Sequence, residues 1–187
     1  LTKNYRSTKP IVGLINEAIK KMQLPDLDSV NEGAPDLKLI NFSSEMAEFD
    51  YLINEIQSSN LPKNEIFVLA RTNRLLNDLS NLMKVKNIKH IRRSDEMKAS
   101  MNVMAKQDEI TLATIHGIKG MEAELVFLMG ATSQNFPCKG TEHPVVEMIK
   151  VHVYEEEEEE RRLFYVGMSR ARKSLRITYT GSKPTYF

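Results

Sequence analysis

Two arginines, one glutamate and one tyrosine have the chemistry needed to hold a nucleoside triphosphate from one side. Tyr5 and Arg6 are neighbours in the sequence Asn-Tyr-Arg-Ser. Glu122 ends a glycine-containing segment, and Arg170 stands in Met-Ser-Arg-Ala. A tyrosine ring can stack on a base, while the planar guanidinium group of arginine contacts two phosphate oxygens at once. Two such arginines would stabilise the charge on a phosphoryl group during its transfer.

The loop that would complete such a site is missing from this sequence. No G-x-x-x-x-G-K-[ST] motif occurs, so no loop of that type can cradle the β-phosphate with its backbone amides. The chain is therefore predicted to supply arginines to an ATP site whose phosphate-binding half lies elsewhere. Leu1 opens directly into motif-like residues, without a starting Met or a signal peptide, which suggests a segment of a longer polypeptide.

The composition predicts an ordinary soluble globular domain and excludes several other classes. The chain has 187 residues, of which 41% are hydrophobic and 27% charged, so residues 1–187 are expected to form a single domain. The single Cys138 excludes an internal disulfide and fits the reducing cytoplasm. No segment approaches the roughly 18 apolar residues of a membrane span. With a net charge of only +1, any contact with nucleic acid must come from a local patch.

Strand-like and helix-like segments alternate along the chain, which predicts a parallel sheet with helices on both faces. The expected strands are residues 37–42, 65–70, 89–93, 110–114, 125–129 and 175–179. The expected helices are residues 7–22, one beginning at Ser43 or Ser44, one beginning at Thr72 or Asn73, and residues 154–172. The second of these helices is expected to bury Met46, Phe49, Leu52, Ile53 and Ile56.

Other segments have simpler interpretations. Residues 24–35 are expected to be a surface loop, and residues 94–108 a short helix or a mobile connector. The six glutamates at 155–160 are expected to be mostly a solvated helix face. Taken singly, Arg170 could close a helix, where its charge complements the dipole, and residues 4–7 could begin one. His90, His143 and His152 lack the spacing of metal ligands, so no metal site is expected.

The order of the motifs favours the functional interpretation, because together they resemble the UvrD/Rep/PcrA group of superfamily 1 helicases. Residues 161–171 resemble motif VI of that group, and residues 111–122 resemble motif V, a loop expected at the carboxyl edge of the sheet. Shorter resemblances are found to motif IV at residues 1–7, to an additional motif at 68–73, and to the extension of motif V at 126–130 and 136–137.

The resemblance is specific to the second, carboxyl-terminal RecA-like motor domain of these helicases. In that family an amino-terminal RecA-like domain and this domain sandwich ATP, with Mg²⁺ held by the amino-terminal one. The resemblance implies that Tyr5 stacks on adenine and that Glu122 meets the ribose. It further implies that Arg6 and Arg170 reach the γ-phosphate as the catalytic residues.

The resemblance also implies a single-stranded DNA track, faced by Arg71, Thr114 and His116. The whole protein would then be an ATP-dependent DNA helicase that moves 3′ to 5′, acts in DNA repair in the cytoplasm and has no membrane association. This chain alone, lacking the P-loop, would be inactive.

The sequence departs from full-size relatives at one place. They carry a large, mostly helical accessory domain before motif V, where this chain has only residues 94–108. Ser169 stands where Thr is usual, and Met121 where Leu is usual. Two alternatives stay open: the motor portion of a helicase–nuclease, and a non-catalytic nucleic-acid-binding relative. Sequence outside these residues would distinguish them.

Overall fold

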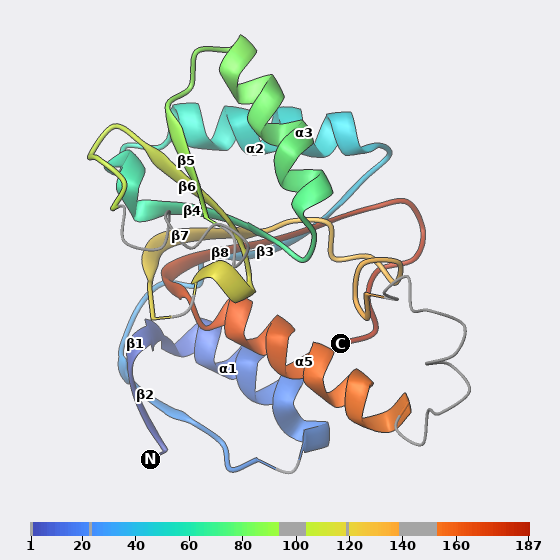
Figure 1. The fold of residues 1–187 in the computed structure, drawn as a ribbon. Helices are drawn as coiled ribbons and strands as arrows, with labels where there is room; N and C mark the ends of the chain where they lie inside the picture. Colours follow the sequence, from blue (N-terminus) through green and yellow to red (C-terminus); the bar gives the residue numbers. More distant parts are fainter. Residues whose placement is uncertain (1, 23, 94–103, 119, 139–152) are drawn as a thin grey trace.

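A six-stranded, all-parallel sheet forms the centre of the domain (Figure 1). The computed structural model describes residues 2–22, 24–93, 104–118, 120–138 and 153–187. In spatial order the strands are β3 (Leu37–Phe42), β8 (Ala171–Thr180), β7 (Ala123–Leu128), β4 (Ile66–Ala70), β6 (Ile110–Thr114) and β5 (His90–Arg93).

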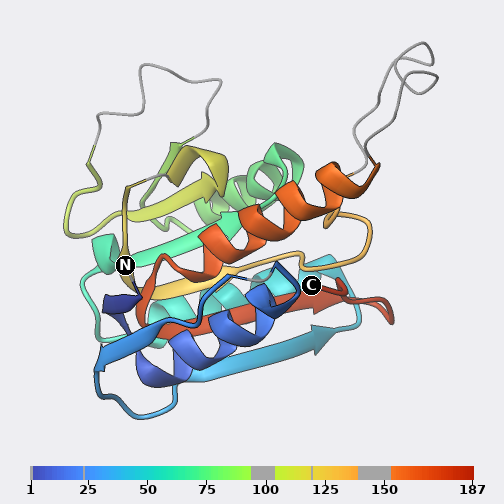
Figure 2. The same ribbon diagram turned by 90° about the horizontal axis from the view of Figure 1, so that it is seen from below.

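Helices cover both faces of this sheet, as the sequence predicted. Helices α2 (Glu45–Ser58) and α3 (Asn73–Val85) lie on one face, and α1 (Lys9–Ile19) and α5 (Val153–Met168) on the other (Figures 1 and 2). In the described residues, short 3₁₀-helices follow α1 (η1, Lys20–Met22), precede β4 (η2, Lys63–Glu65) and follow β6 (η4, His116–Ile118). Within the described parts of the chain, no helix is both long and apolar enough to cross a membrane.

The central strand β4 shows why the sheet needs cover on both sides. All five of its residues are buried. Ile66 and Val68 pack in the cluster beneath α2 and α3, whereas Phe67 and Leu69 belong to the cluster beneath α1 and α5. Because both faces of this strand are buried, in two separate cores, its sequence is continuously apolar. This pattern is typical of a parallel sheet.

The amino-terminal residues form a strand, and two sequence predictions are wrong here. Strand β1 (Lys3–Thr8) pairs in parallel with β2 (Asp28–Asn31), which lies inside the predicted surface loop 24–35. The predicted helix 7–22 begins only at Lys9, with a proline in its first turn. Polar contacts hold the pair: the Ser29 hydroxyl donates to the Ser7 carbonyl at 2.7 Å. Hydrogen bonds of this kind leave no apolar pattern in the sequence, so the strand could not be predicted from it.

Helix α5 ends earlier than predicted, and the last strand begins earlier. The helix stops at Met168 instead of continuing to residue 172, and β8 starts at Ala171 instead of 175. The Ser169 hydroxyl donates to the Val166 carbonyl at 2.9 Å, and such a local bond competes with helix continuation. Arg170 therefore lies in the turn between helix and strand, not within the helix.

Two further expectations are affected by the structure. Helix α2 buries four of its five predicted core residues, Phe49, Leu52, Ile53 and Ile56. The prediction is wrong at Met46, which is 57% exposed, whereas Glu48 is fully buried in its place. The predicted connector lies mostly outside the described residues, which resume at Met104, and residues 104–108 contain no helix. His143 and His152 also lie outside the described residues.

Glu48 is a carboxyl group inside the core between α2 and the sheet. Its Oε1 accepts hydrogen bonds from the Gly130 amide at 2.9 Å and the Thr178 hydroxyl at 2.5 Å. Its Oε2 is buried and has no hydrogen-bond partner. Burial raises the pKa of Glu48 above its ordinary value of 4.5, despite these two bonds. The native state therefore holds this proton more tightly than the unfolded chain does.

We expect Glu48→Gln to stabilise the domain at pH 7 by about 1 kcal/mol, because an ionised carboxylate with one unsatisfied oxygen is costly to bury. Since the folded pKa is raised, the cost of Glu48 appears as the pH rises above 4.5. Urea unfolding at pH 4.5, 6 and 7.5 should show a gain that grows with pH. Asp50→Asn, at an exposed position of the same helix, is the control, and a pH-independent gain would contradict the assignment.

Candidate functional site

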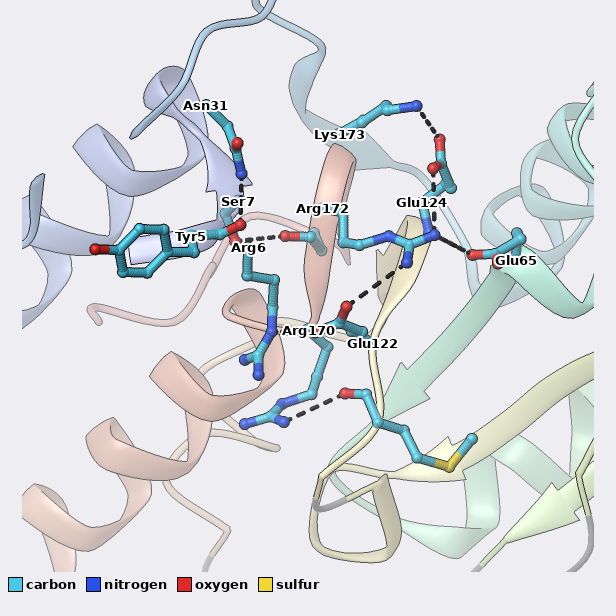
Figure 3. A network of polar contacts seen from close by, with 12 residues as sticks. Tyr5, Arg6, Ser7, Asn31, Glu65, Glu122, Glu124, Arg170, Arg172 and Lys173 are labelled. Carbon is cyan, nitrogen blue, oxygen red and sulfur yellow. Dashed lines mark hydrogen bonds and ion pairs between the residues drawn. The ribbon is translucent and has the colours of Figure 1, made fainter. Parts of the chain in front are cut away.

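Three of the predicted site residues meet at the amino-terminal edge of the sheet (Figure 3). Glu122 directly precedes β7, and Arg170 directly precedes β8. Arg6 comes from β1, which is fixed beside the start of β8 because the Ser7 hydroxyl donates to the Ala171 carbonyl at 2.6 Å. Residues far apart in the sequence are thus gathered by strand starts that lie side by side.

Arg170 is a half-buried cation held by backbone carbonyl groups. Its Nε donates to the Val166 carbonyl at 3.0 Å, and its Nη1 to the Met121 carbonyl at 3.2 Å. Among the described residues, no carboxylate forms an ion pair with it. Burial, and then the nearby charge of Arg6, lower the pKa of Arg170. An anion bound here would relieve both effects.

Arg6 does have a carboxylate partner, and that partner is shared. Its Nε pairs with Oε2 of Glu122, while its Nη1 donates to the Ser169 carbonyl at 3.3 Å. The second oxygen of Glu122 lies 3.6 Å from Nη1 of Arg172. All three of these ion-paired side chains are about one-third exposed, so an incoming ligand can reach them.

Tyr5 offers an open ring next to these charges. The residue is 70% exposed, and its ring points away from the ion pairs (Figure 3). The backbone around it is fixed by side chains: the Asn31 amide donates to the Tyr5 carbonyl at 2.7 Å, and Asn4 Oδ1 accepts from the Arg6 amide at 2.9 Å. The ring is thus presented from a constrained strand and is free to stack on a planar ligand.

The predicted DNA contacts lie at the opposite, carboxyl-terminal edge. Strands β4 and β6 are neighbours, with Ala70 opposite Thr114 in the register, so Arg71 and Thr114 both follow or end a strand there. His116 begins η4 just beyond. The sequence analysis expected the segment 111–122 to form a loop at the carboxyl edge. Thr114 does lie at that edge, but Glu122 lies at the amino edge. Because β6 and β7 are parallel, the segment between them has to run from one edge of the sheet to the other.

Arg71 forms an ion pair with Glu160, a residue of the glutamate run. Its Nε and Nη2 both donate to Glu160, at 3.0 and 2.7 Å, and this bond raises the pKa of Arg71. The Glu160 side chain is only 12% exposed, so the solvated face expected for most of the glutamate run does not include this residue, which the motif resemblance also covers. Thr114 is buried, and its hydroxyl oxygen accepts from the Gly117 amide at 3.1 Å.

One part of the amino-edge site was not predicted from the sequence. Arg172, at the start of β8, pairs through Nη2 with Glu65 at 2.7 Å and with Glu124 at 3.2 Å. Lys173 pairs with Glu124 at 2.7 Å. These charges belong to three different strand starts, so only the strand order brings them together. No cluster of three or more His, Cys, Asp or Glu side chains that could hold a metal ion occurs in the described part of the chain.

The structure is a parallel α/β domain that presents two neighbouring arginines, Arg6 and Arg170, at one edge of its sheet. Comparison of the sequence with protein families identifies which domain this is. The UvrD-like helicase C-terminal domain family matches residues 1–98 and 93–182, and the chain belongs to that family.

Sequence relatives agree with this assignment over part of the chain. The ATP-dependent DNA helicase PcrA of Bacillus subtilis (strain 168) is 43% identical over 72 residues, which are 38% of this chain and 8% of the relative. The ATP-dependent DNA helicase Rep of Buchnera aphidicola subsp. Schizaphis graminum is 35% identical over 106 residues, 57% of this chain and 14% of the relative. The matches thus span only a small part of the relatives' length.

A solved structure shares the fold. It is the C-terminal domain of a possible DNA helicase from Lactobacillus plantarum WCFS1, with a TM-score of 0.67 at 17% sequence identity. The alignment covers 97% of this chain and 90% of that one. At this level of identity the similarity supports the arrangement of helices and strands and carries no argument about individual side chains.

We expect pyrophosphate to stabilise this chain, because it would bring negative charge to Arg170 and Arg6. At a concentration tenfold above Kd, one bound anion adds about 1.4 kcal/mol, or roughly 3–6 °C in Tm for a domain of this size. Thermal unfolding with and without sodium pyrophosphate measures this shift. Arg170→Gln should lose most of it, while Lys20→Gln, which removes one exposed charge elsewhere, should keep it. Equal shifts in all three proteins would contradict an anion site at Arg170.

Proposed function

We propose that this chain is the second motor domain of an ATP-dependent DNA helicase and supplies the arginines of a composite ATP site. ATP, with its Mg²⁺, is held by the P-loop of an amino-terminal RecA-like domain. Arg6 and Arg170 then contact the γ-phosphate, Tyr5 stacks on adenine, and Glu122 meets the ribose. Without the other domain, this chain does not hydrolyse ATP.

The observation that supports this proposal most is the state of Arg170. A half-buried guanidinium group that lies beside a second arginine and lacks a carboxylate partner among the described residues is an unfavourable arrangement for a purely structural residue. It becomes favourable when a phosphate approaches. Because the carbonyl bonds fix Nε and Nη1 in advance, little reorganisation is needed when charge develops on the phosphoryl oxygens.

We further propose that single-stranded DNA runs along the carboxyl-terminal edge, contacted by Arg71, Thr114 and His116. Since Glu160 already balances Arg71, a DNA phosphate has to share that guanidinium group. Contacts of this kind give weak, sequence-independent binding. In the whole protein, alternating grip by the two motor domains moves the strand 3′ to 5′, in DNA repair in the cytoplasm.

The return between β6 and β7 supports a connection between the two edges. It begins at Thr114, on the proposed DNA edge, and ends at Glu122, which pairs with Arg6 on the proposed nucleotide edge. A shift of the backbone at Thr114 or at Glu122 would therefore be transmitted to the other residue through the short segment between them. Residues 94–108 are too few to contain the accessory domain that full-size relatives carry there. We therefore assign no contact with duplex DNA to this chain. The two matched family segments meet at this same place.

We expect Arg170→Lys, in the polypeptide that carries both motor domains, to lose ATP turnover by about 10³-fold while ATP binding changes little. Lysine keeps the charge but lacks the planar fork that contacts two oxygens. DNA-stimulated phosphate release measures turnover, and equilibrium titration with a fluorescent ATP analogue measures binding. Lys20→Gln is the control for general loss of charge. Near-normal turnover in Arg170→Lys would mean that Arg170 only closes its helix.

A further inference from the structure

Glu122 lies between two arginines at the amino edge, Arg6 and Arg172. Its Oε2 pairs with Arg6, which faces the proposed phosphate position. Its Oε1 lies 3.6 Å from Arg172, which is anchored in turn by Glu65 and Glu124 (Figure 3). Arg172 is thus fixed by the strand starts around it, whereas Arg6 has no other carboxylate partner among the described residues.

This arrangement creates a conflict for the proposed reaction. Arg6 cannot give its full charge to a phosphate while its Nε stays paired with Glu122. If Arg6 leaves, the Glu122 carboxylate is left close to the negatively charged triphosphate. Two like charges held close together in a partly buried site repel each other. Some other cation then has to hold Glu122 away from the phosphate.

We propose that Arg172 is a positioning residue that holds Glu122 in place, so that Arg6 can exchange this carboxylate for the γ-phosphate. The inference rests on the proposed function, because it concerns the same ATP site. In the free domain the Glu122 carboxylate interacts with both Arg6 and Arg172. With ATP bound, Arg6 turns to the phosphate and Glu122 stays with Arg172, still placed to meet the ribose.

The position of Arg172 suits this role. Its side chain is 30% exposed and belongs to the second residue of β8, two residues after Arg170. The anchoring carboxylates Glu65 and Glu124 come from the starts of β4 and β7. Because these anchors belong to the rigid sheet, Arg172 keeps its place when Arg6 moves. Lys173 also pairs with Glu124 and would retain that anchor if Arg172 were replaced.

A double-mutant cycle on ATP hydrolysis tests the proposal, in the polypeptide that carries both motor domains and with saturating single-stranded DNA. We expect Arg172→Gln alone to lower kcat/KM for ATP about tenfold, because Glu122 then holds Arg6 and repels the phosphate. In a Glu122→Gln background, the same substitution should cost less than about twofold, since the carboxylate it serves is gone. Thermal unfolding of each variant checks that the fold is intact.

Two further variants make the outcome decisive. Arg172→Lys keeps a charge beside the carboxylates, and we expect it to restore part of the loss; it also serves for the cycle if Arg172→Gln does not fold. Lys20→Gln should leave kcat/KM unchanged. Equal losses from Arg172→Gln in both backgrounds would overturn the proposal, because Arg172 would then act through Glu65 or Glu124 alone. If the parent protein shows no ATP turnover that depends on Arg170, the proposed function itself fails.

Discussion

The placement of Arg170 is the constraint on which the rest of the site depends. Its guanidinium group is held by the carbonyls of Val166 and Met121, at the end of α5 and just before β7. The early stop of the helix at Met168 puts Arg170 in a turn and at a strand start, beside Arg6. A helix continuing to residue 172 would point the same side chain elsewhere. Local helix termination thereby decides what the amino edge can bind.

The parallel sheet keeps the two proposed functional edges apart. Glu122 and Arg170 precede strand starts, with Arg6 of β1 beside them, while Arg71 and Thr114 lie at strand ends. With about 3.3 Å of rise per residue, strands of five or six residues separate the two sets by roughly 15–20 Å. The return from β6 to β7 spans that distance within one segment. This arrangement allows one domain to contact two ligands without either blocking the other.

Most of the fold was predictable from the sequence, because buried parallel strands such as Ile66–Ala70 leave an apolar pattern. The motif residues Arg6, Glu122 and Arg170 were also predictable as a group. Strand β2 was not, since its pairing with β1 depends on polar side chains such as Ser29. Nor were the partners of Arg71 and Arg172, because an ion pair between residues distant in sequence depends on strand order. A run of charged residues in the sequence does not indicate which oppositely charged side chains it will contact.

The account is tested most directly by measuring ATP hydrolysis with this chain alone and with the polypeptide that adds the P-loop domain. We expect no phosphate release above background from the chain alone, with or without single-stranded DNA, because no loop here holds the β-phosphate. We expect turnover in the larger polypeptide, stimulated by DNA. Turnover by the chain alone that Arg170→Ala abolishes would contradict the composite site, since the domain would then be sufficient for catalysis.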